Sequence, residues 1–510
     1  MAKATKWTLC TRRLARHATG ISPCQMRQLY QAVAIPSFSY AADIWFMPIE
    51  WPVGCKMARG SVGVARRLTS VQRIATMAIT GALCTSATDI LEVHANLWPI
   101  ELLMHWTCHR VVLWLAVLPD THPLHKIVKV TACQDVKRHR SPLHLLLHTF
   151  RIKPADYELI APGSRPPNRR DSLLTHIAGS REESWEEDLH DDAKVCIYSD
   201  GSGLNGMAAA AAVLFWGGRE IEATCYRLGP LSHHTTYEAE IVGVLLALQL
   251  VSNEDEADTV SIRLDNQAVV WALTNHRAQP AQSLLDAIHG LCDDWRKCNQ
   301  WRRSQIRISW VSGHDRAMGN ERADAEAKKA VEEGSSPDVT LPVETREDEL
   351  PVSLAAAVAA FRDELHVQWR ELWARSPQWR KLAKIDAKLP SPAFLWATDD
   401  LTRAQVSVLM QLRTGHAPLN TFLHQIGKVD SPCCPACLGA DETVHHFLFD
   451  CPAHAHAQHA LARKLGRLSK SVHHLLGNWR AFQTTLKFVG ETGRLQTSHG
   501  DLPMKPARDQ

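Results

Sequence analysis

Between Lys194 and Glu333 the spacing of apolar residues is typical of strands in some segments and of helices in others. Three consecutive strands are predicted at 195–198, 207–216 and 221–228. They are followed by a helix at 235–251, a strand at 260–264, a helix at 281–298, a strand at 306–311 and a helix at 320–333. This order predicts an α/β domain in which helices flank a mixed, five-stranded sheet.

The sequence on either side of this domain predicts helices and connecting segments. Apolar residues at three- and four-residue spacing indicate an all-helical region at 1–150, and prolines followed by an acidic run indicate a linker at 151–190. The α/β domain is assigned to residues 191–334. We expect a second linker at 335–350, a tryptophan-rich helical region at 351–480 and a flexible tail at 481–510.

Four acidic residues fall where predicted strands end or helices begin: Asp200, Glu240, Asp265 and Asp324. Such positions can meet at one edge of an α/β layer, and His314 lies on the loop before the last helix. Four oxygen ligands suit two Mg²⁺ or Mn²⁺ ions, which together can promote phosphodiester cleavage. Taken singly, each acid fits a helix cap or a solvated residue as well.

Five short blocks resemble the type 1 ribonuclease H family, in the same order along the chain. They are 198–202 (YSDGS), 235–240 (TTYEAE), 264–267 (LDNQ), 310–314 (WVSGH) and 319–324 (GNERAD). The resemblance implies the fold predicted above and hydrolysis of the RNA strand of RNA–DNA hybrids. It implies that Asp200, Glu240, Asp265 and Asp324 bind two Mg²⁺ or Mn²⁺ ions, and that His314 helps water attack or product leave.

The block at 235–240 contains two glutamates, Glu238 and Glu240. The family's glutamate begins an apolar helix, and Glu240 directly precedes Ile241. The resemblance therefore assigns the metal-binding role to Glu240, and we expect Glu238 to be exposed.

Contacts with the hybrid are expected at two places. Gly201, Ser202 and Asn266 adjoin the predicted carboxylates, although Gly201 fits a plain turn nearly as well. A basic, tryptophan-containing stretch supplies Arg296, Lys297, Arg302 and Arg303, which could hold phosphates. The alternative for this stretch is a solvated connection with Trp295 packed inward. The 2′-hydroxyls of a hybrid distinguish its RNA strand from DNA.

A cluster of cysteine and histidine residues lies at 433–452. Cys434, Cys437, His446 and Cys451 have the spacing C-x2-C-x8-H-x4-C, which predicts a closed, structural Zn²⁺ site. Two alternatives remain open: Cys433 in place of Cys434, and His445 in place of His446. A chance group of buried cysteines is the competing interpretation. The segment resembles the zinc knuckle that follows ribonuclease H in some non-LTR retrotransposon polyproteins.

The N-terminal region is similar to the helical part downstream of the reverse-transcriptase palm in the same elements. The similarity rests on short phrases at 29–45 and 71–82. A polymerase needs a Tyr-x-Asp-Asp hairpin, and the stretch 40–43 (YAAD) lacks the second aspartate, so no polymerase activity is expected. We interpret the chain as the C-terminal portion of a retroelement protein.

The whole-chain charge is close to neutral, with 57 Lys+Arg against 54 Asp+Glu, but its distribution is uneven. Residues 191–334 carry a net charge of −7 and the rest of the chain +10. We therefore expect the basic flanks and the zinc knuckle to attract the hybrid and single-stranded RNA or DNA. No signal sequence or membrane span is recognised, so a nuclear or cytoplasmic, non-secreted protein without a membrane partner is expected.

Two further functions compete with the hybrid ribonuclease. A catalytically inactive, nucleic-acid-binding retroelement remnant would have lost residues of the site, whereas all five expected residue types are present. A transposase or integrase of the same fold would need a different carboxylate spacing and no His314 block.

Overall fold

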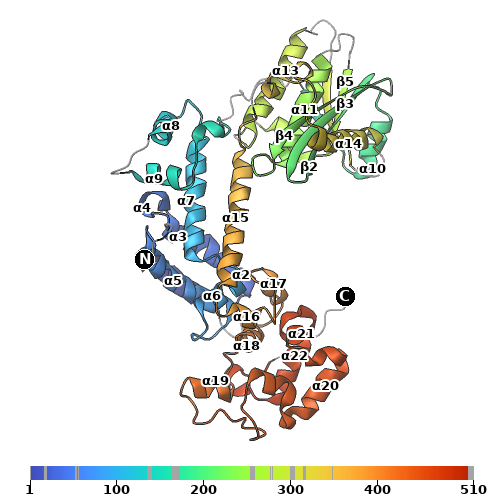
Figure 1. Cartoon of the computed structure of the whole chain (residues 1–510). Helices are drawn as coiled ribbons and strands as arrows, with labels where there is room; N and C mark the ends of the chain where they lie inside the picture. Colours follow the sequence, from blue (N-terminus) through green and yellow to red (C-terminus); the bar gives the residue numbers. More distant parts are fainter. Residues whose placement is uncertain are drawn as a thin grey trace. The chain divides into compact units, whose positions relative to one another are not determined.

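The computed structural model describes residues 2–15, 20–51, 54, 57–134, 140–161, 173–252, 259–275, 277, 279–298, 305–313, 317–346 and 349–502 (Figure 1). The chain forms two compact units, residues 109–363 and residues 1–108 with 364–510. This division differs from the consecutive segments expected from the sequence, because the N-terminal and C-terminal helices build one unit together.

The unit of residues 109–363 contains a single mixed sheet in its described part. Its strands are β1 (Leu173–His176), β2 (Val195–Leu204), β3 (Met207–Trp216), β4 (Arg219–Pro230), β5 (Thr259–Leu264) and β6 (Gln305–Trp310), in the order β1-β6-β5-β2-β3-β4. Strands β2, β3 and β4 pair antiparallel, and the pairs β2–β5, β5–β6 and β1–β6 are parallel. The expected mixed α/β sheet is confirmed.

The predicted strand count of five was wrong, because β1 adds a sixth strand at the edge. Strand β1 has only four residues, with Leu173 buried and His176 exposed, and it lies in the segment that was expected to be a linker. A strand this short gives too little alternation to stand out in a sequence with many prolines nearby.

Helices pack on both faces of the sheet. Val195, Ile197, Val260 and Ile262 face one large core together with α11 (Thr236–Ser252), α12 (Gln267–Thr274) and α13 (Gln282–Cys298). On the opposite face, the alanines of β3 at 209 and 211 meet those of α14 (Met318–Glu333) at 327 and 330. Small side chains on both elements allow α14 to approach the sheet closely.

The acidic run in the expected linker at 151–190 forms helix α10 (Arg181–Leu189). The side chain of Ser180 accepts a hydrogen bond from the amide of Glu183 and caps the helix. Acidic residues in the first turn, Glu182 and Glu183, favour a helix start. The linker prediction therefore missed two elements, β1 and α10.

The remaining elements of this unit are helical. They are part of α7 (Ile100–Ala116), α8 (His125–Cys133), α9 (Pro142–Thr149), the 3₁₀ turns at Pro154–Asp156, Asp338–Thr340 and Val343–Thr345, and part of α15 (Leu354–Ala374). The buried carboxylate of Glu158 accepts hydrogen bonds from the amides of Ala281 and Leu354, each at 2.8 Å. This carboxylate therefore ties together the starts of α13 and α15.

The second unit is helical in its described part, with short 3₁₀ and π turns between helices. Its α-helices are α1 (Ala2–Arg12), α2 (Pro23–Leu29), α3 (Ile35–Ser39), α4 (Ala42–Trp45), α5 (Val62–Thr80), α6 (Thr88–Ala95), α16 (Trp379–Leu382), α17 (Ala393–Ala397), α18 (Arg403–Thr414), α19 (Asn420–Gln425), α20 (Ala455–Leu465), α21 (Val472–Gly477), α22 (Trp479–Thr492) and α23 (Gln496–His499). Helices α7 and α15 contribute their other parts.

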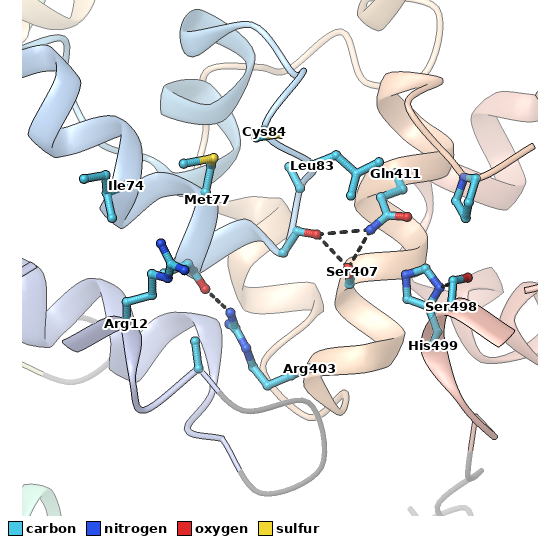
Figure 2. Close-up of a pocket in the computed structure, with 15 residues that line it drawn as sticks. Arg12, Ile74, Met77, Leu83, Cys84, Arg403, Ser407, Gln411, Ser498 and His499 are labelled. Carbon is cyan, nitrogen blue, oxygen red and sulfur yellow. Dashed lines mark hydrogen bonds between the residues drawn. The ribbon is translucent and has the colours of Figure 1, made fainter. Parts of the chain in front are cut away.

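Helices α5 and α18 meet at a cavity of about 510 Å³ in this unit (Figure 2). The buried guanidinium of Arg403 donates to the carbonyls of Ala78 and Ile79 at the end of α5. The hydroxyl of Ser407 donates to the carbonyl of Gly81 at 2.6 Å. Carbonyls that the end of α5 leaves unpaired thus receive donors from α18.

The segment expected to be a flexible tail is folded through residue 499. Helix α22 buries Phe482 and Leu486, and Arg494 donates from Nε and Nη2 to the buried carboxylate of Glu442, at 2.6 and 2.7 Å. A bidentate pair with a buried carboxylate fixes this part of the chain. Among the described residues, no helix is both long and apolar enough to span a membrane.

Candidate functional site

Three of the predicted metal-binding carboxylates meet at one edge of the sheet. Asp200 lies in β2, Glu240 in the second turn of α11 and Asp265 directly after β5. One oxygen atom from each lies within 4.8 Å of the others. The parallel pairing of β2 with β5 brings the two aspartates to the same edge.

Two glycines allow these carboxylates to come together. A Cβ on Gly201 would lie 2.3 Å from the backbone nitrogen of Glu240, so β2 and α11 touch through their backbones. A Cβ on Gly313 would lie 2.3 Å from Oδ2 of Asp265. Neither position tolerates a side chain without a shift of the site.

Burial and mutual repulsion make the group of carboxylates hard to ionise without a cation. Burial, followed by the charges of Asp265 and Asp324, raises the pKa of Asp200 to about 7. Burial, followed by the charges of Asp200 and Asp265, raises the pKa of Glu240 well above its usual value. A divalent cation bound here would lower the pKa of both carboxyl groups.

One oxygen of this group has no hydrogen-bond partner within the described part of the chain. It is Oε2 of Glu240, a fully buried atom. A buried carboxylate oxygen without a donor costs free energy unless a cation or proton satisfies it. The oxygen-only donor set also matches what Mg²⁺ and Mn²⁺ prefer. The residues present therefore fit a divalent metal.

Asp324 lies beside the group of three, on α14. Its carboxyl shares a hydrogen bond with Asp200, and its Oδ2 lies 2.6 Å from Nζ of Lys328. Lys328 is one helical turn further along α14, and the i,i+4 spacing of Asp324 and Lys328 is the sequence signal for this pair. The structure thus brings the fourth predicted acid, Asp324, to the site together with the ammonium group of Lys328.

The expectation that Glu238 is exposed was wrong. Glu238 is 4% exposed, and its Oε2 accepts hydrogen bonds from the amide and the hydroxyl of Thr235, at 2.7 and 3.1 Å. The Thr235 hydroxyl accepts in turn from the amide of Glu238. This reciprocal capping box starts α11, and the T-x-x-E spacing at 235–238 was the signal for it.

The residues expected to contact nucleic acid occupy different environments. Gly201 is packed against α11, and Ser202 is 7% exposed. Asn266 caps α12 through Oδ1, which accepts from the amide of Ala268, and its side chain also hydrogen-bonds Glu240. Arg296 and Lys297 are exposed, and Lys297 pairs with Asp294 at 2.7 Å. Trp295 is buried at the end of α13, as the alternative interpretation of this stretch required.

Three of the predicted site residues lie outside the described residues. They are His314, which comes between β6 and α14 in the sequence, and Arg302 and Arg303, which come between α13 and β6.

The four predicted zinc ligands lie together in the other unit. Sγ of Cys434 is 3.7 Å from Sγ of Cys451, and Sγ of Cys437 is 3.4 Å from Nε2 of His446. Tetrahedral zinc with Zn–S bonds of about 2.3 Å separates two sulfur atoms by roughly 3.8 Å. The ligand atoms all lie within 4.8 Å of one another, so the set fits one tetrahedral ion.

The two alternative ligands point elsewhere. Sγ of Cys433 contacts the carbonyl of Leu438 at 3.8 Å. Nδ1 of His445 pairs with Asp450 at 2.7 Å, and both side chains are exposed. The geometry therefore favours Cys434 and His446 over their neighbours.

The α/β domain is similar to known proteins over most of its length. The RNase H family model matches residues 192–332. A ribonuclease H of Janthinobacterium sp. (strain Marseille) is 32% identical over 146 residues, which cover 27% of this chain and 96% of that protein. A ribonuclease H of Bartonella bacilliformis (strain ATCC 35685 / KC583 / Herrer 020/F12,63) is 29% identical over 154 residues, covering 27% of this chain and 88% of that protein.

Among solved structures, RNase H1 of the halophilic archaeon Halobacterium salinarum NRC-1 is 24% identical. The similarity covers 27% of this chain and 98% of that one, with a TM-score of 0.22. The residues matched by the family model include Asp200, Glu240, Asp265 and Asp324, and they begin after α10.

Proposed function

We propose that this chain, which belongs to the ribonuclease H family through residues 192–332, is a metal-dependent endonuclease that hydrolyses the RNA strand of RNA–DNA hybrids. One observation carries the proposal: Asp200, Glu240 and Asp265 converge with oxygen atoms within 4.8 Å of one another. The partnerless oxygen of Glu240 supports a cation at this place.

The carboxylates of Asp200, Glu240, Asp265 and Asp324 would hold two Mg²⁺ or Mn²⁺ ions. Such ions, when bound, supply activation of the attacking water and stabilisation of the leaving oxygen. The protein's own contribution is to hold the carboxylates at a fixed edge of the sheet. We assign His314 the assistance of water attack or product release, which rests on the family resemblance.

Binding of the hybrid would draw on charge outside the acidic domain. Residues 191–334 carry a net charge of −7 and the remainder +10, so phosphates are attracted mainly by the flanks. Within the domain, we assign phosphate contacts to Arg296, Lys297, Arg302 and Arg303. Ser202 and Asn266 are assigned hybrid contacts next to the carboxylates.

We also propose that Cys434, Cys437, His446 and Cys451 bind one structural Zn²⁺ ion. The sulfur–sulfur and sulfur–nitrogen distances of 3.7 and 3.4 Å support a tetrahedral site. All four positions are taken by protein, which leaves no open position for catalysis. The ion would stabilise a segment with a small core of its own, and that segment could bind single-stranded RNA or DNA.

The wider context that we propose is a retrotransposon protein that acts in the nucleus or the cytoplasm. The resemblance of residues 29–45 and 71–82 to the region after a reverse-transcriptase palm supports it, as does the zinc motif after the α/β domain. DNA synthesis by this chain is not expected, since the paired-aspartate hairpin is lacking from the sequence.

The test is a cleavage assay on the full chain with Mg²⁺ and an end-labelled RNA strand. The RNA is presented alone, annealed to DNA and annealed to RNA, and a DNA duplex of the same sequence is the fourth substrate. We expect cleavage of the RNA only in the hybrid. A hybrid that is shifted in a gel and stays intact would support an inactive, nucleic-acid-binding remnant instead.

A further inference from the structure

Helix α10 and the two residues after it contact three positions next to the candidate catalytic carboxylates. The three positions are Tyr198, Arg263 and Ser312. Tyr198 lies in β2, two residues before Asp200, and Arg263 lies in β5, two residues before Asp265. We call the five residues that make these contacts the brace: Ser184, Trp185, Glu187, Asp188 and Asp191. The brace lies outside the residues that the family model matches, which begin at 192.

The first contact holds the backbone of Ser312 from both sides. The buried hydroxyl of Ser184 accepts a hydrogen bond from the amide of Ser312, at 3.1 Å. Nε1 of Trp185 donates to the carbonyl of Ser312, at 3.0 Å. The next residue, Gly313, lies directly against the carboxylate of Asp265, where an added Cβ would meet Oδ2 at 2.3 Å. A shift of Ser312 would therefore move Gly313 and displace the carboxylate of Asp265.

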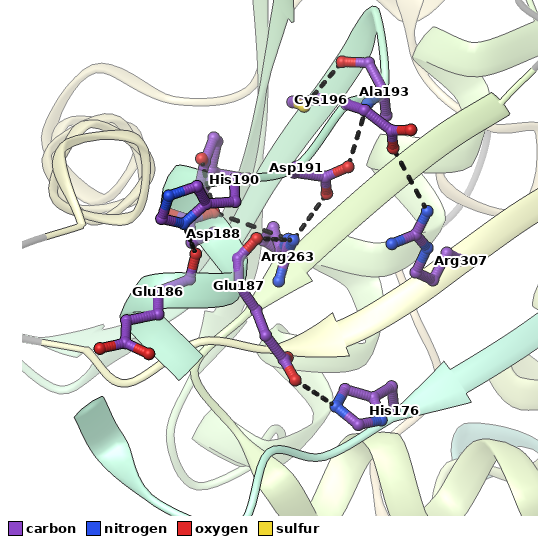
Figure 3. A network of polar contacts seen from close by, with 12 residues as sticks. His176, Glu186, Glu187, Asp188, His190, Asp191, Ala193, Cys196, Arg263 and Arg307 are labelled. Atoms are coloured by element: carbon purple, nitrogen blue, oxygen red, sulfur yellow. Dashed lines mark hydrogen bonds and ion pairs between the residues drawn. The ribbon is translucent and has the colours of Figure 1, made fainter. Parts of the chain in front are cut away.

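The second contact is a buried ion pair at β5 (Figure 3). Nη2 of Arg263 lies 2.6 Å from Oδ2 of Asp191, and both side chains are 2% exposed. The same Nη2 donates to the carbonyl of Glu187 at 3.2 Å, and Nε lies 3.6 Å from Asp188. Because loss of one partner leaves a buried charge, this pair resists separation of β5 from the brace.

The third contact joins β2 to the brace. The hydroxyl of Tyr198 donates to Oδ1 of Asp188, at 2.8 Å. The ring of Tyr198 lies so close to Gly319 that an added Cβ there would come within 2.2 Å of it. Gly319 lies in the first turn of α14, the helix that carries Asp324. The brace thus contacts β2 and β5 directly and α14 through Tyr198, and these three elements carry or directly precede Asp200, Asp265 and Asp324.

We propose that the brace positions Asp200, Asp265 and Asp324 for metal binding by fixing Ser312, Arg263 and Tyr198 from outside the family domain. This proposal rests on the proposed function of the same site. Metal sites need ligands held within about 0.5 Å, so loss of the brace contacts changes the site before it unfolds the domain. The brace residues are positioning residues, since none of them is among the carboxylates that converge at the site.

The test uses two conservative variants of the full chain. Trp185→Phe removes the indole N–H and keeps an aromatic ring, and Ser184→Ala removes the hydroxyl. Glu186→Gln is the matched control, because Glu186 is an exposed residue of the same helix whose carboxylate points away from the network (Figure 3). Far-UV circular dichroism and thermal unfolding establish that each variant is folded at the assay temperature.

Two measurements separate positioning from a purely structural role. We expect the double variant S184A/W185F to lose on the order of tenfold in kcat with KM changed less than twofold, because misplaced groups affect the transition state most. We also expect the double variant to need a several-fold higher Mn²⁺ concentration at the midpoint of a calorimetric titration. The signal of Asp200→Asn is subtracted to remove binding elsewhere on the chain. Glu186→Gln should match the wild type in both.

A double variant with a lower melting temperature but unchanged kcat and Mn²⁺ midpoint would overturn the brace proposal. If the wild-type chain cleaves no hybrid, the proposed function fails. The brace proposal is then tested by the Mn²⁺ midpoint alone. A raised midpoint in the double variant supports the proposal, and an unchanged midpoint overturns it.

Discussion

Gly201 lies so close to Glu240 that a Cβ added to the glycine would sit 2.3 Å from the glutamate's backbone nitrogen. Strand β2 and helix α11 therefore meet without a side chain between them. The neighbouring carboxylate of Asp200 and that of Glu240 owe their proximity to this contact. The glycine at this position is explained by packing inside the protein, whereas the sequence had suggested a close approach of nucleic acid or a turn.

Replacing Gly201 by alanine should damage both stability and the site. The new methyl group overlaps backbone atoms of α11, and overpacking of this kind costs about 1–3 kcal/mol. We expect a lower melting temperature and weaker Mn²⁺ binding. Gly290→Ala is the control, because nothing lies within 4 Å of its Cβ position in helix α13. It should be neutral or raise stability by up to about 1 kcal/mol.

The raised pKa of Asp200 predicts a pH-dependent stability in Mg²⁺-free buffer. Burial, then Asp265 and Asp324, raise this pKa from 3.8 to about 7. Between these values the folded state binds a proton that the unfolded state has lost, so stability should fall as pH rises from about 4 to 7. Asp200→Asn should remove this part of the slope and be the more stable protein at pH 8, by on the order of 2–4 kcal/mol.

Denaturant unfolding at several pH values measures this difference. Below pH 4, wild type and Asp200→Asn should agree within error. A difference between the two proteins that does not change with pH would contradict the assignment. Added Mg²⁺ should stabilise the wild type at pH 8 more than the variant, because the variant lacks one carboxylate ligand.

The two glutamates of α11 should respond differently to the same change. Glu240→Gln replaces a buried carboxylate of the proposed metal site, and we expect at least a hundredfold loss of kcat with little loss of stability. Glu238→Gln keeps a side chain that can complete the capping box, so it should cost about 1 kcal/mol or less and leave kcat within threefold. Comparable losses of kcat in both variants would contradict the division of roles.

Zinc content tests the cysteine–histidine cluster. The wild-type chain should contain one zinc ion per molecule, and the variants Cys434→Ser with Cys437→Ser, and His446→Ala, should lose it. Cys433→Ser and His445→Ala are matched controls, since those side chains contact Leu438 and Asp450 instead. Full zinc retention in Cys434→Ser with Cys437→Ser, by elemental analysis, would refute the ligand set.

The order of strands and helices in the α/β domain was predictable because long elements repeat their pattern often enough. Strand β3 and helix α11, for example, have 10 and 17 residues. Short elements were not predictable: β1 has four residues and α12 has eight. Helix α10 was hidden by its acidic composition, which is as typical of a linker as of a solvated helix start.

The candidate site was predictable where residue type and position suffice, as for Asp200, Glu240 and Asp265. The burial of Glu238 did not follow from its charge, because it depends on the capping box that Glu238 forms with Thr235. Contacts such as Trp185 with Ser312 join residues 127 positions apart, and no local pattern encodes them. For the same reason, the pairing of Arg494 with Glu442 across 52 positions was invisible in a segment expected to be flexible.

We propose that the carboxylates around Asp200 hold the divalent metal with which this chain cleaves the RNA strand of a hybrid. The most direct measurement is single-turnover cleavage of a labelled hybrid by the full chain with Mg²⁺, for wild type and Asp200→Asn, with hybrid binding measured in Ca²⁺. We predict cleavage by the wild type, at least a hundredfold slower cleavage by the variant, and binding by both. Equal cleavage by the two proteins, or an intact hybrid with both, would contradict this role of the carboxylates.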